Sequence, residues 1–276
     1  MDRYAVIGKP IQHSKSPLIH QAFAQATGQV LTYEKIEGTL GQFAATVDRF
    51  RAEGGLGLNV TVPFKTDACA YATDLAESAR AAGAANALKF EGDLCFAQNF
   101  DGVGLVRDIV HNLGHAVQGK RVLLLGAGGA TRGAILPLLA EAPARLFVAN
   151  RTVDKAMDLV GFFHDQGAST QVLEGGGYPD LHSDAFDIVI NATSASLTAD
   201  LPPLPVTALD ANGLAYDMVY GKGLTPFLQL AQRSNVRHLA DGVGMLVEQA
   251  AEAFAWWRGV RPDTQPVIRQ LTVPLV

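Results

Sequence analysis

The chain has 276 residues, of which 48% are hydrophobic and 18% are charged, and its formal net charge is −5. This composition is typical of a globular protein with enough apolar material for one large domain or two ordinary ones. The negative charge argues against a nucleic-acid partner. No apolar run reaches the roughly 18 residues needed to cross a bilayer, and the N-terminus lacks the features of a signal peptide, so we expect a cytoplasmic protein.

The cysteines and histidines give no sign of a metal site. Cys69 and Cys95 are the only cysteines, they have no C-x-x-C spacing, and the seven histidines are scattered. We therefore expect free thiols in a reducing compartment and no bound metal.

The first part of the chain alternates predicted strands with predicted helices, which indicates a mostly parallel α/β sheet. The first helix has Pro17 at its first turn and Gly28 at its end. A predicted hairpin, with strands at 86–90 and 94–98, closes this region. The other predicted elements are strands at 4–8, 30–37 and 57–62, and helices at 16–28 and 40–53.

The strand at 57–62 has the period of two that is typical of a half-buried strand. Its apolar residues Leu58, Val60 and Val62 are expected in the core. Asn59 and Thr61 then point to the opposite face.

A predicted helix at 101–113 leads into a second α/β alternation. We expect two domains, 1–103 and 104–244, with the C-terminal helices of 245–276 packing back on the first. The predicted elements of the second part are strands at 122–126, 144–150, 186–192 and 213–219, and helices that begin near 131, at 153 and at 241.

The segment RVLLLGAGGATRGA, residues 121–134, predicts a dinucleotide-binding turn. Gly126, Gly128 and Gly129 lie between a buried strand and a helix. Glycines let the backbone approach a pyrophosphate at a helix N-terminus. Thr131 replaces the third glycine of the usual G-x-G-x-x-G pattern, and an ordinary tight turn is the alternative.

The end of the next strand, VANRT, favours NADP(H) over NAD(H). An NAD-binding chain would place a carboxylate there to bind the ribose hydroxyl. This chain has Asn150, Arg151 and Thr152, with Lys155 one turn later. Arginine and lysine suit a 2′-phosphate. Asp154 weakens that preference, and a solvated helix start is the alternative.

Polar residues of the first part gather at the ends of strands and hairpins, where parallel sheets bind ligands. Neutral hydroxyl and amide groups suit a polyhydroxylated small molecule. Burial favours the neutral amine of a lysine and a nearby carboxylate favours its ammonium, so a Lys–Asp pair can exchange a proton with a substrate oxygen. Helix capping, polar strand faces and a structural salt bridge are the alternatives. The residues are Ser14, Lys15, Ser16, Asn59, Thr61, Lys65, Asn86, Asn99 and Asp101.

Eight motifs occur in this order: SKSP (14–17), NVTVPFK (59–65), DGVG (101–104), GAGGA (126–130), NRT (150–152), NATS (191–194), YDMVY (216–220) and DGVGML (241–246). Together they resemble the shikimate dehydrogenase family over nearly the whole chain. The resemblance implies NADP-dependent interconversion of 3-dehydroshikimate and shikimate in aromatic amino-acid biosynthesis. It also implies a substrate domain followed by a Rossmann-like dinucleotide-binding domain.

The resemblance assigns a role to each motif residue. Lys65 and Asp101 become the catalytic pair. The substrate carboxylate would be bound by Ser14, Ser16 and Tyr220, and the ring hydroxyls would be bound by Asn59, Thr61, Asn86 and Gln249. The cofactor residues are Gly126, Ala127, Gly128, Gly129, Ala130, Asn150, Arg151, Thr152, Lys155, Thr193, Met218 and Gly242.

Three departures from the family pattern affect the expected site. Ala87 and Phe100 replace threonines, and Ser196 replaces a glycine. Because a polar site discriminates strongly when a partner is missing, we expect Phe100→Thr to change kcat/KM for shikimate. The alternative functions are a paralogous quinate-type dehydrogenase and a non-catalytic NADP-binding regulatory module. The expected assembly is a monomer or homodimer.

Overall fold

The computed structural model describes residues 1–181, 185–193, 201–221 and 223–275. The chain forms two compact units. The first comprises Met1–Gly104 and Leu246–Arg269, and the second comprises Leu105–Met245 and Gln270–Val276. The expectation that the whole of 245–276 packs on the first domain was therefore too broad, since the last segment groups with the second unit.

A six-stranded sheet with the order β2-β1-β3-β5-β6-β4 forms the centre of the first unit. β1 pairs in parallel with β2 and β3, whereas β5 runs antiparallel to β3 and β6. The predicted hairpin is thus confirmed. The strands are β1 (Asp2–Gly8), β2 (Leu31–Glu37), β3 (Gly55–Val60), β4 (Asp74–Leu75), β5 (Ala87–Glu91) and β6 (Leu94–Gln98).

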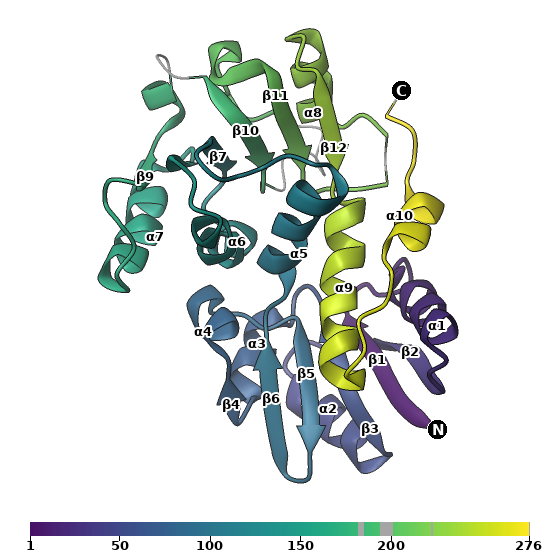
Figure 1. Ribbon diagram of the computed structural model, residues 1–276. Helices are drawn as coiled ribbons and strands as arrows, with labels where there is room; N and C mark the ends of the chain where they lie inside the picture. Colours follow the sequence, from purple (N-terminus) through teal and green to yellow (C-terminus); the bar gives the residue numbers. More distant parts are fainter. Residues whose placement is uncertain (182–184, 194–200, 222, 276) are drawn as a thin grey trace. The chain divides into compact units, whose positions relative to one another are not determined.

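Four complete helices belong to the first unit, and α1 lies alongside β2 in Figure 1. As predicted, α1 carries a proline in its first turn and ends at Gly28, whose φ of 66° favours glycine. The helices are α1 (Ser16–Thr27), α2 (Phe43–Ala52), α3 (Lys65–Tyr71) and α4 (Glu77–Ala82).

The core of the first unit includes Leu58 and Val60 of β3, as the alternation predicted. The same prediction was wrong for Val62, which is 64% exposed. β3 ends at Val60, so the period of two no longer applies to the turn that follows. Asn59 is buried between its apolar neighbours, which means that its amide needs hydrogen-bond partners inside the protein.

The second unit contains a six-stranded sheet with the order β12-β11-β10-β7-β8-β9, and every pairing described is parallel. This is the doubly wound order of a Rossmann fold, and its direction reverses between β7 and β10. The α/β fold class is confirmed. The strands are β7 (Arg121–Leu125), β8 (Arg145–Ala149), β9 (Leu173–Gly176), β10 (Phe186–Asn191), β11 (Leu209–Asp217) and β12 (His238–Asp241).

The remaining helices include one departure from the predicted geometry. The segment expected as one helix at 101–113 is α-helical only to Arg107 and continues as a π-helix. The bounds are α5 (Asp101–Arg107), the π-helix η1 (Asp108–Asn112), α6 (Gly129–Ala140), α7 (Val153–Asp165), the 3₁₀ turns η2 (Tyr178–Leu181) and η4 (Val206–Ala208), α8 (Pro226–Arg233), α9 (Val243–Arg258) and α10 (Gln265–Leu271).

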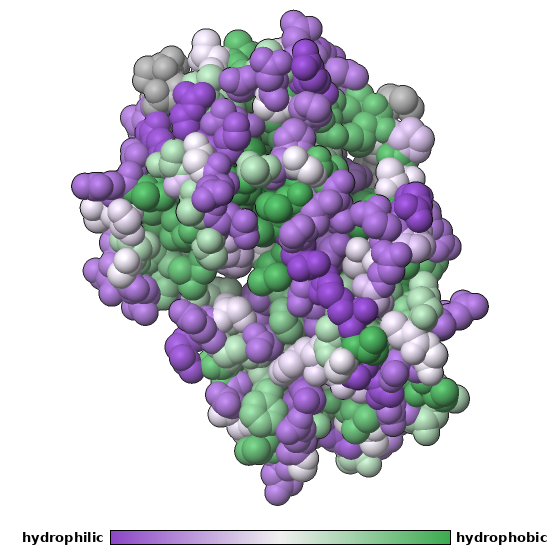
Figure 2. All heavy atoms as spheres, in the orientation of Figure 1, coloured by the Kyte–Doolittle hydropathy of each residue, from purple (hydrophilic) through white to green (hydrophobic). Residues whose placement is uncertain are grey.

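In the view of Figure 2, hydrophilic side chains are spread widely and hydrophobic ones appear in scattered groups. Within the described part of the chain, no helix is long and apolar enough to cross a bilayer.

A buried carboxylate stabilises the start of α9. Asp108 accepts a 2.7 Å hydrogen bond from the Tyr216 hydroxyl and a 2.9 Å bond from Asn112 Nδ2. Burial raises the pKa of Tyr216, which keeps its hydroxyl available as a donor. A Cβ atom at Gly244 would lie 1.8 Å from Asp108 Oδ1. The first turn of α9 therefore fits against the carboxylate only with glycine at this position, and negative charge there suits the helix N-terminus.

We predict that Gly244→Ala lowers the free energy of unfolding by at least about 2 kcal/mol, because Asp108 is anchored and cannot move aside cheaply. Gly161→Ala, in α7, is the matched helical control because nothing lies within 4 Å of its Cβ position. The control gains up to about 1 kcal/mol from the better helix propensity of alanine. Urea unfolding of both variants measures the difference, and equal stabilities would contradict the packing argument.

Candidate active site

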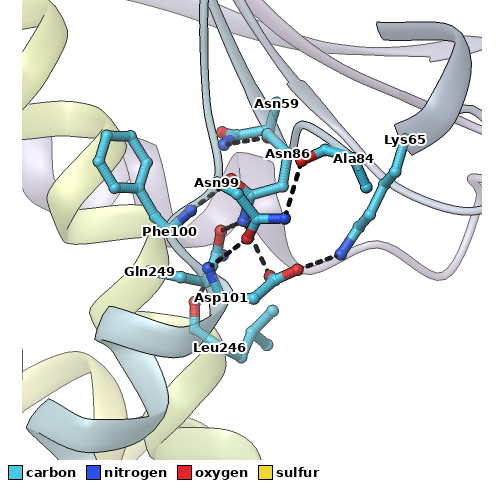
Figure 3. Close-up of polar contacts among 9 residues, drawn as sticks. All are labelled: Asn59, Lys65, Ala84, Asn86, Asn99, Phe100, Asp101, Leu246 and Gln249. Atoms are coloured by element: carbon cyan, nitrogen blue, oxygen red, sulfur yellow. Dashed lines mark hydrogen bonds and ion pairs between the residues drawn. The ribbon is translucent and has the colours of Figure 1, made fainter. Parts of the chain in front are cut away.

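Lys65 and Asp101, the predicted catalytic pair, form an ion pair in the first unit (Figure 3). Lys65 is the first residue of α3 and Asp101 is the first residue of α5. The distance from Lys65 Nζ to Asp101 Oδ2 is 2.5 Å, and the two side chains are 30% and 16% exposed. A pair so placed is less screened than one on the open surface, yet a substrate can still reach it.

Asn86 fixes the orientation of the Asp101 carboxylate. Its Nδ2 donates to Asp101 Oδ1 at 2.8 Å and to Gln249 Oε1 at 3.2 Å (Figure 3). Its Oδ1 accepts from the backbone N–H of Phe100 at 2.9 Å. The direction of the Asn86 amide is therefore determined by its neighbours. Both carboxylate oxygens of Asp101 are engaged, one by Asn86 and one by Lys65.

Asn99, which the sequence pattern included without a role, supports the same loop. Its Oδ1 accepts from the backbone N–H of Asp101 at 3.1 Å. Its Nδ2 donates to the carbonyl of Ala84 at 3.0 Å, just ahead of Asn86 in the chain. Asn99 thus ties the residues that precede α5 to the loop that enters β5.

Tyr33 and Asn59 extend this network, and the two serines of the SKSP motif bond to each other. Ser14 Oγ donates to Ser16 Oγ at 3.2 Å. The Tyr33 hydroxyl donates to Asn59 Oδ1 at 2.7 Å, and Asn59 Nδ2 donates to the Asn86 carbonyl at 3.3 Å. Tyr33, Asn59 and Asn86 therefore form one connected path.

The sequence-based prediction missed Tyr33 as a member of the site. The available signal was an aromatic residue in a strand whose other members are largely polar, LTYEKIE. In the structure Tyr33 is the one buried residue of β2. Its hydroxyl needs a partner because it lies away from solvent, and Asn59 Oδ1 accepts its hydrogen bond.

Helix capping, the alternative role for Ser16 and Asp101, does not describe the structure. Ser16 is the first residue of α1 and not its cap, since the cap position is Lys15 and makes no side-chain bond. The carboxylate of Asp101 bonds Lys65 and Asn86.

Thr61 follows β3, and its methyl group packs against Gly8. A Cβ atom at Gly8 would lie 2.5 Å from Thr61 Cγ2, so glycine at this position makes room for the threonine.

Phe100, one of the departures from the family pattern, contributes its backbone to the network and its ring to α9. The ring meets Trp256 edge-on at a centroid distance of 5.8 Å, and it points away from Lys65 in Figure 3. Ala87 is fully buried in β5, opposite Asn59. Ser196 lies outside the described residues.

The glycine turn of the second unit fits a pyrophosphate. Gly126 has a φ of +100°, and a Cβ there would lie 2.9 Å from Thr193 Cγ2, which follows β10. The turn and Thr193 thus meet where the strand order reverses. At Gly128 and Gly129 nothing lies within 4 Å of the Cβ position, so a side chain would fill open space at the N-terminus of α6. The N-terminus of α6 therefore has room for a group that binds to backbone N–H donors.

Thr131, which replaces the third glycine, has a structural role. It is fully buried, and its hydroxyl donates to the Gly126 carbonyl at 2.7 Å. The variant residue therefore closes the turn with a hydrogen bond.

The cationic residues predicted for the 2′-phosphate lie beyond the end of β8. Arg151 and Lys155 are exposed, and neither forms an ion pair with a carboxylate within the part of the chain described. Asn150 Nδ2 donates to the Thr152 carbonyl at 2.8 Å, which shapes the turn between them. Burial raises the pKa of Tyr178, and the nearby positive charge of Arg151 partly opposes this effect.

The last predicted cofactor residues, Met218 and Gly242, are neighbours in the second unit. A Cβ at Gly242 would lie 2.3 Å from the Met218 carbonyl oxygen, so the two backbones touch. Tyr220 also belongs to the second unit and is 39% exposed. Ser14 and Ser16, with which the resemblance groups it, belong to the first unit.

No cluster of three or more histidine, cysteine, aspartate or glutamate side chains among residues 1–181, 185–193, 201–221 and 223–275 is arranged to hold a metal ion.

The chain matches three family descriptions. They are "Shikimate dehydrogenase substrate binding domain" over residues 6–88, "Shikimate / quinate 5-dehydrogenase" over 108–199, and "Shikimate 5'-dehydrogenase C-terminal domain" over 242–272.

Relatives and solved structures agree with these matches. A protein of Nitrosospira multiformis named shikimate dehydrogenase (NADP(+)) is 56% identical, over 98% of this chain and 97% of that protein. The Ael1 enzyme of Pseudomonas putida is 58% identical with a TM-score of 0.96 and full coverage of both chains. Shikimate 5-dehydrogenase of Thermus thermophilus, solved with NADP(H) and shikimate, is 28% identical, with a TM-score of 0.85 over 98% of this chain and 100% of that one. The chain belongs to the shikimate dehydrogenase family.

Proposed function

We propose that the chain is an NADP-dependent oxidoreductase that interconverts shikimate and 3-dehydroshikimate. The observation that carries this proposal is the Lys65–Asp101 pair, held by Asn86 in a chain 56% identical to a named NADP-dependent shikimate dehydrogenase. The first unit takes the role of the substrate domain and the second unit that of the cofactor domain. The alternatives, a quinate-type paralogue and a regulatory module, are not favoured, because the relatives are named as this enzyme.

The cofactor assignments rest on the open glycine turn and the exposed cations. Gly126 to Ala130 would hold the pyrophosphate with backbone N–H groups, and Asn150, Arg151, Thr152 and Lys155 the 2′-phosphate. Thr193, Met218 and Gly242 complete the proposed site. When bound, NADP(H) supplies the donor or acceptor of the hydride.

We assign the proton transfer to and from the substrate oxygen to Lys65. A lysine ammonium has three N–H donors, and Asp101 Oδ2 takes one of them. The others remain for a substrate oxygen. In the reduction, Lys65 donates a proton to the carbonyl oxygen as it becomes a hydroxyl, and in the oxidation it takes the proton back. Asp101 stabilises the ammonium, and Asn86 keeps the carboxylate oriented toward it.

We assign the remaining substrate contacts from the family motifs. Ser14 and Ser16 offer hydroxyl groups for the carboxylate, with Tyr220 as the third member of that set. Asn59, Thr61, Asn86 and Gln249 offer amide and hydroxyl groups for the ring hydroxyls. Neutral donors and acceptors of this kind orient a hydroxylated ligand by geometry more than by charge.

The setting of the enzyme is also proposed. Cys69 and Cys95 are free thiols, which supports a reducing compartment, and we place the enzyme in the cytoplasm. We propose a monomer or a homodimer.

We predict that Lys65→Met lowers kcat for shikimate oxidation by about 10²- to 10⁴-fold, because the proton acceptor is lost. Lys89→Met is the matched control, since Lys89 is also 30% exposed and pairs with Glu91 at 2.6 Å in the same unit. Initial rates of NADP⁺ reduction measure both variants. Wild-type protein that is folded but inactive with shikimate would reject the proposed function. A Lys65→Met variant within threefold of wild type would reject the role of Lys65.

We predict that Arg151→Ala raises KM for NADP⁺ by about tenfold to a hundredfold, the effect of losing one charged hydrogen-bonding contact. KM for NAD⁺, which has no 2′-phosphate, stays within about twofold. Arg233→Ala, at the exposed end of α8, is the control and leaves both values unchanged. An equal change for NADP⁺ and NAD⁺ would show that Arg151 does not read the 2′-phosphate.

A further inference from the structure

Asn99 is a buried amide of the first unit that the proposed mechanism does not use. It is 5% exposed and lies between β6 and α5, two residues ahead of Asp101. A buried amide needs partners for both its oxygen and its nitrogen, and Asn99 finds them on the backbones of two segments. Its Oδ1 accepts from the N–H of Asp101 at 3.1 Å, and its Nδ2 donates to the carbonyl of Ala84 at 3.0 Å (Figure 3).

The loop that Asn99 binds also holds the backbone of Lys65. Ala85, which follows Ala84 in that loop, donates its N–H to the Lys65 carbonyl at 2.8 Å. Lys65 is the first residue of α3, so its side chain starts from a backbone position that the loop constrains. Asn99 is thus one hydrogen bond away from the backbone of Asp101 and two hydrogen bonds away from the backbone of Lys65.

The bridge formed by Asn99 is anchored at its own backbone and has one orientation. The Asn99 N–H donates to Ser78 Oγ of α4 at 3.1 Å, and Ser78 Oγ donates to Gln98 Oε1 at 2.9 Å. Turning the Asn99 amide by half a turn would set its nitrogen against the Asp101 N–H and its oxygen against the Ala84 carbonyl. Only the observed orientation therefore satisfies both partners.

The turn ahead of α5 does not by itself explain an asparagine at this position. That turn needs only an acceptor for the Asp101 N–H, which a serine or an aspartate also supplies. The donor to the Ala84 carbonyl is what the amide adds. The donor serves the link between the two segments.

We propose that Asn99 is a positioning residue that holds the backbones of Lys65 and Asp101 in register, so that the ammonium and the carboxylate meet. The proposal rests on the proposed function, because it takes this ion pair as the proton-transferring unit. A displacement of about 1 Å at reacting groups can cost about a hundredfold in rate. Asn99 acts through backbone atoms and takes no part in the transfer itself.

The test is Asn99→Ser, which keeps an acceptor for the Asp101 N–H and removes the donor to Ala84. We expect kcat for shikimate oxidation to fall by about tenfold to a hundredfold, with KM for NADP⁺ within about twofold of wild type. Thr73→Ala is the matched control in the same unit. Thr73 Oγ1 donates to the Cys95 carbonyl at 3.0 Å and accepts from the Cys95 N–H at 2.7 Å, so the control also loses bonds to backbone.

The control lowers the thermal midpoint and leaves kcat unchanged, because Thr73 does not contact the ion pair or its loop. A folded Asn99→Ser enzyme with the wild-type kcat overturns the proposal. An equal fall in kcat in Thr73→Ala also overturns it, since the effect would then belong to the stability of the unit. Wild-type protein without shikimate turnover overturns the proposed function and this inference with it.

Combination with Lys65→Met separates positioning from a general loss of active protein. If Asn99 acts by placing Lys65 against its partner, Asn99→Ser lowers kcat by no more than about twofold once Lys65 has lost its amine. A structural defect lowers kcat by the same factor in both backgrounds, and that result overturns the proposal.

Ser78→Ala tests the same bridge if Asn99→Ser does not fold. Ser78 is half-buried and its substitution leaves the Asn99 amide in place. The Asn99 N–H loses its acceptor, and kcat falls by at least about threefold. A folded Ser78→Ala enzyme with the wild-type kcat overturns the proposal.

Discussion

The arrangement of the first unit depends on one buried side chain, the amide of Asn86. Its NH₂ group binds Asp101 and Gln249, its oxygen binds the backbone of Phe100, and its own backbone carbonyl accepts from Asn59. A buried amide with fully assigned partners has a single orientation. The position of the Asp101 carboxylate, and through it the position of the Lys65 ammonium, follows from that orientation.

The second unit relies on backbone more than on side chains. Gly126 allows the turn after β7 to meet Thr193 after β10, and Gly128 and Gly129 leave the space ahead of α6 open. Thr131 closes the turn from inside with its hydroxyl. The sheet places the turn, and the glycines keep the space beside its backbone open. A short glycine motif between a strand and a helix therefore predicts such a turn. The two units therefore differ in how they are built: the first orients charged and polar side chains, and the second leaves backbone N–H groups accessible.

Local pattern predicted the elements whose periodicity matches their burial. α1 was predicted from Pro17 and Gly28, and the core face of β3 from Leu58 and Val60. The prediction that Val62 is buried was wrong because the strand ends two residues earlier and a turn has no alternating faces. β9 was missed because LEGG has neither alternation nor β-branched residues. β9 pairs with β8, and Gly175 in β9 allows α7 to approach. A Cβ atom at Gly175 would lie 3.0 Å from the Ala156 carbonyl oxygen, a contact that only the tertiary structure reveals.

The candidate site divides in the same way. Family motifs named Lys65, Asp101 and Asn86, and the structure joins them in one hydrogen-bonded group. Tyr33 was missed because its role arises from tertiary packing, in which its ring stacks on His20 of α1 and its hydroxyl bonds Asn59. Phe100 was singled out because it replaces a threonine beside Asp101, and its ring packs edge-on against Trp256.

The most direct test of the account is a double-mutant cycle on kcat with Lys65→Met, Asp101→Asn and the combined variant. If the two side chains act as one proton-transferring unit oriented by Asn86, the second substitution removes nothing that the first has not already removed. The account predicts that the double variant is within about threefold of the slower single variant. Losses that multiply in the double variant would contradict it, because they would mean that Lys65 and Asp101 contribute independently.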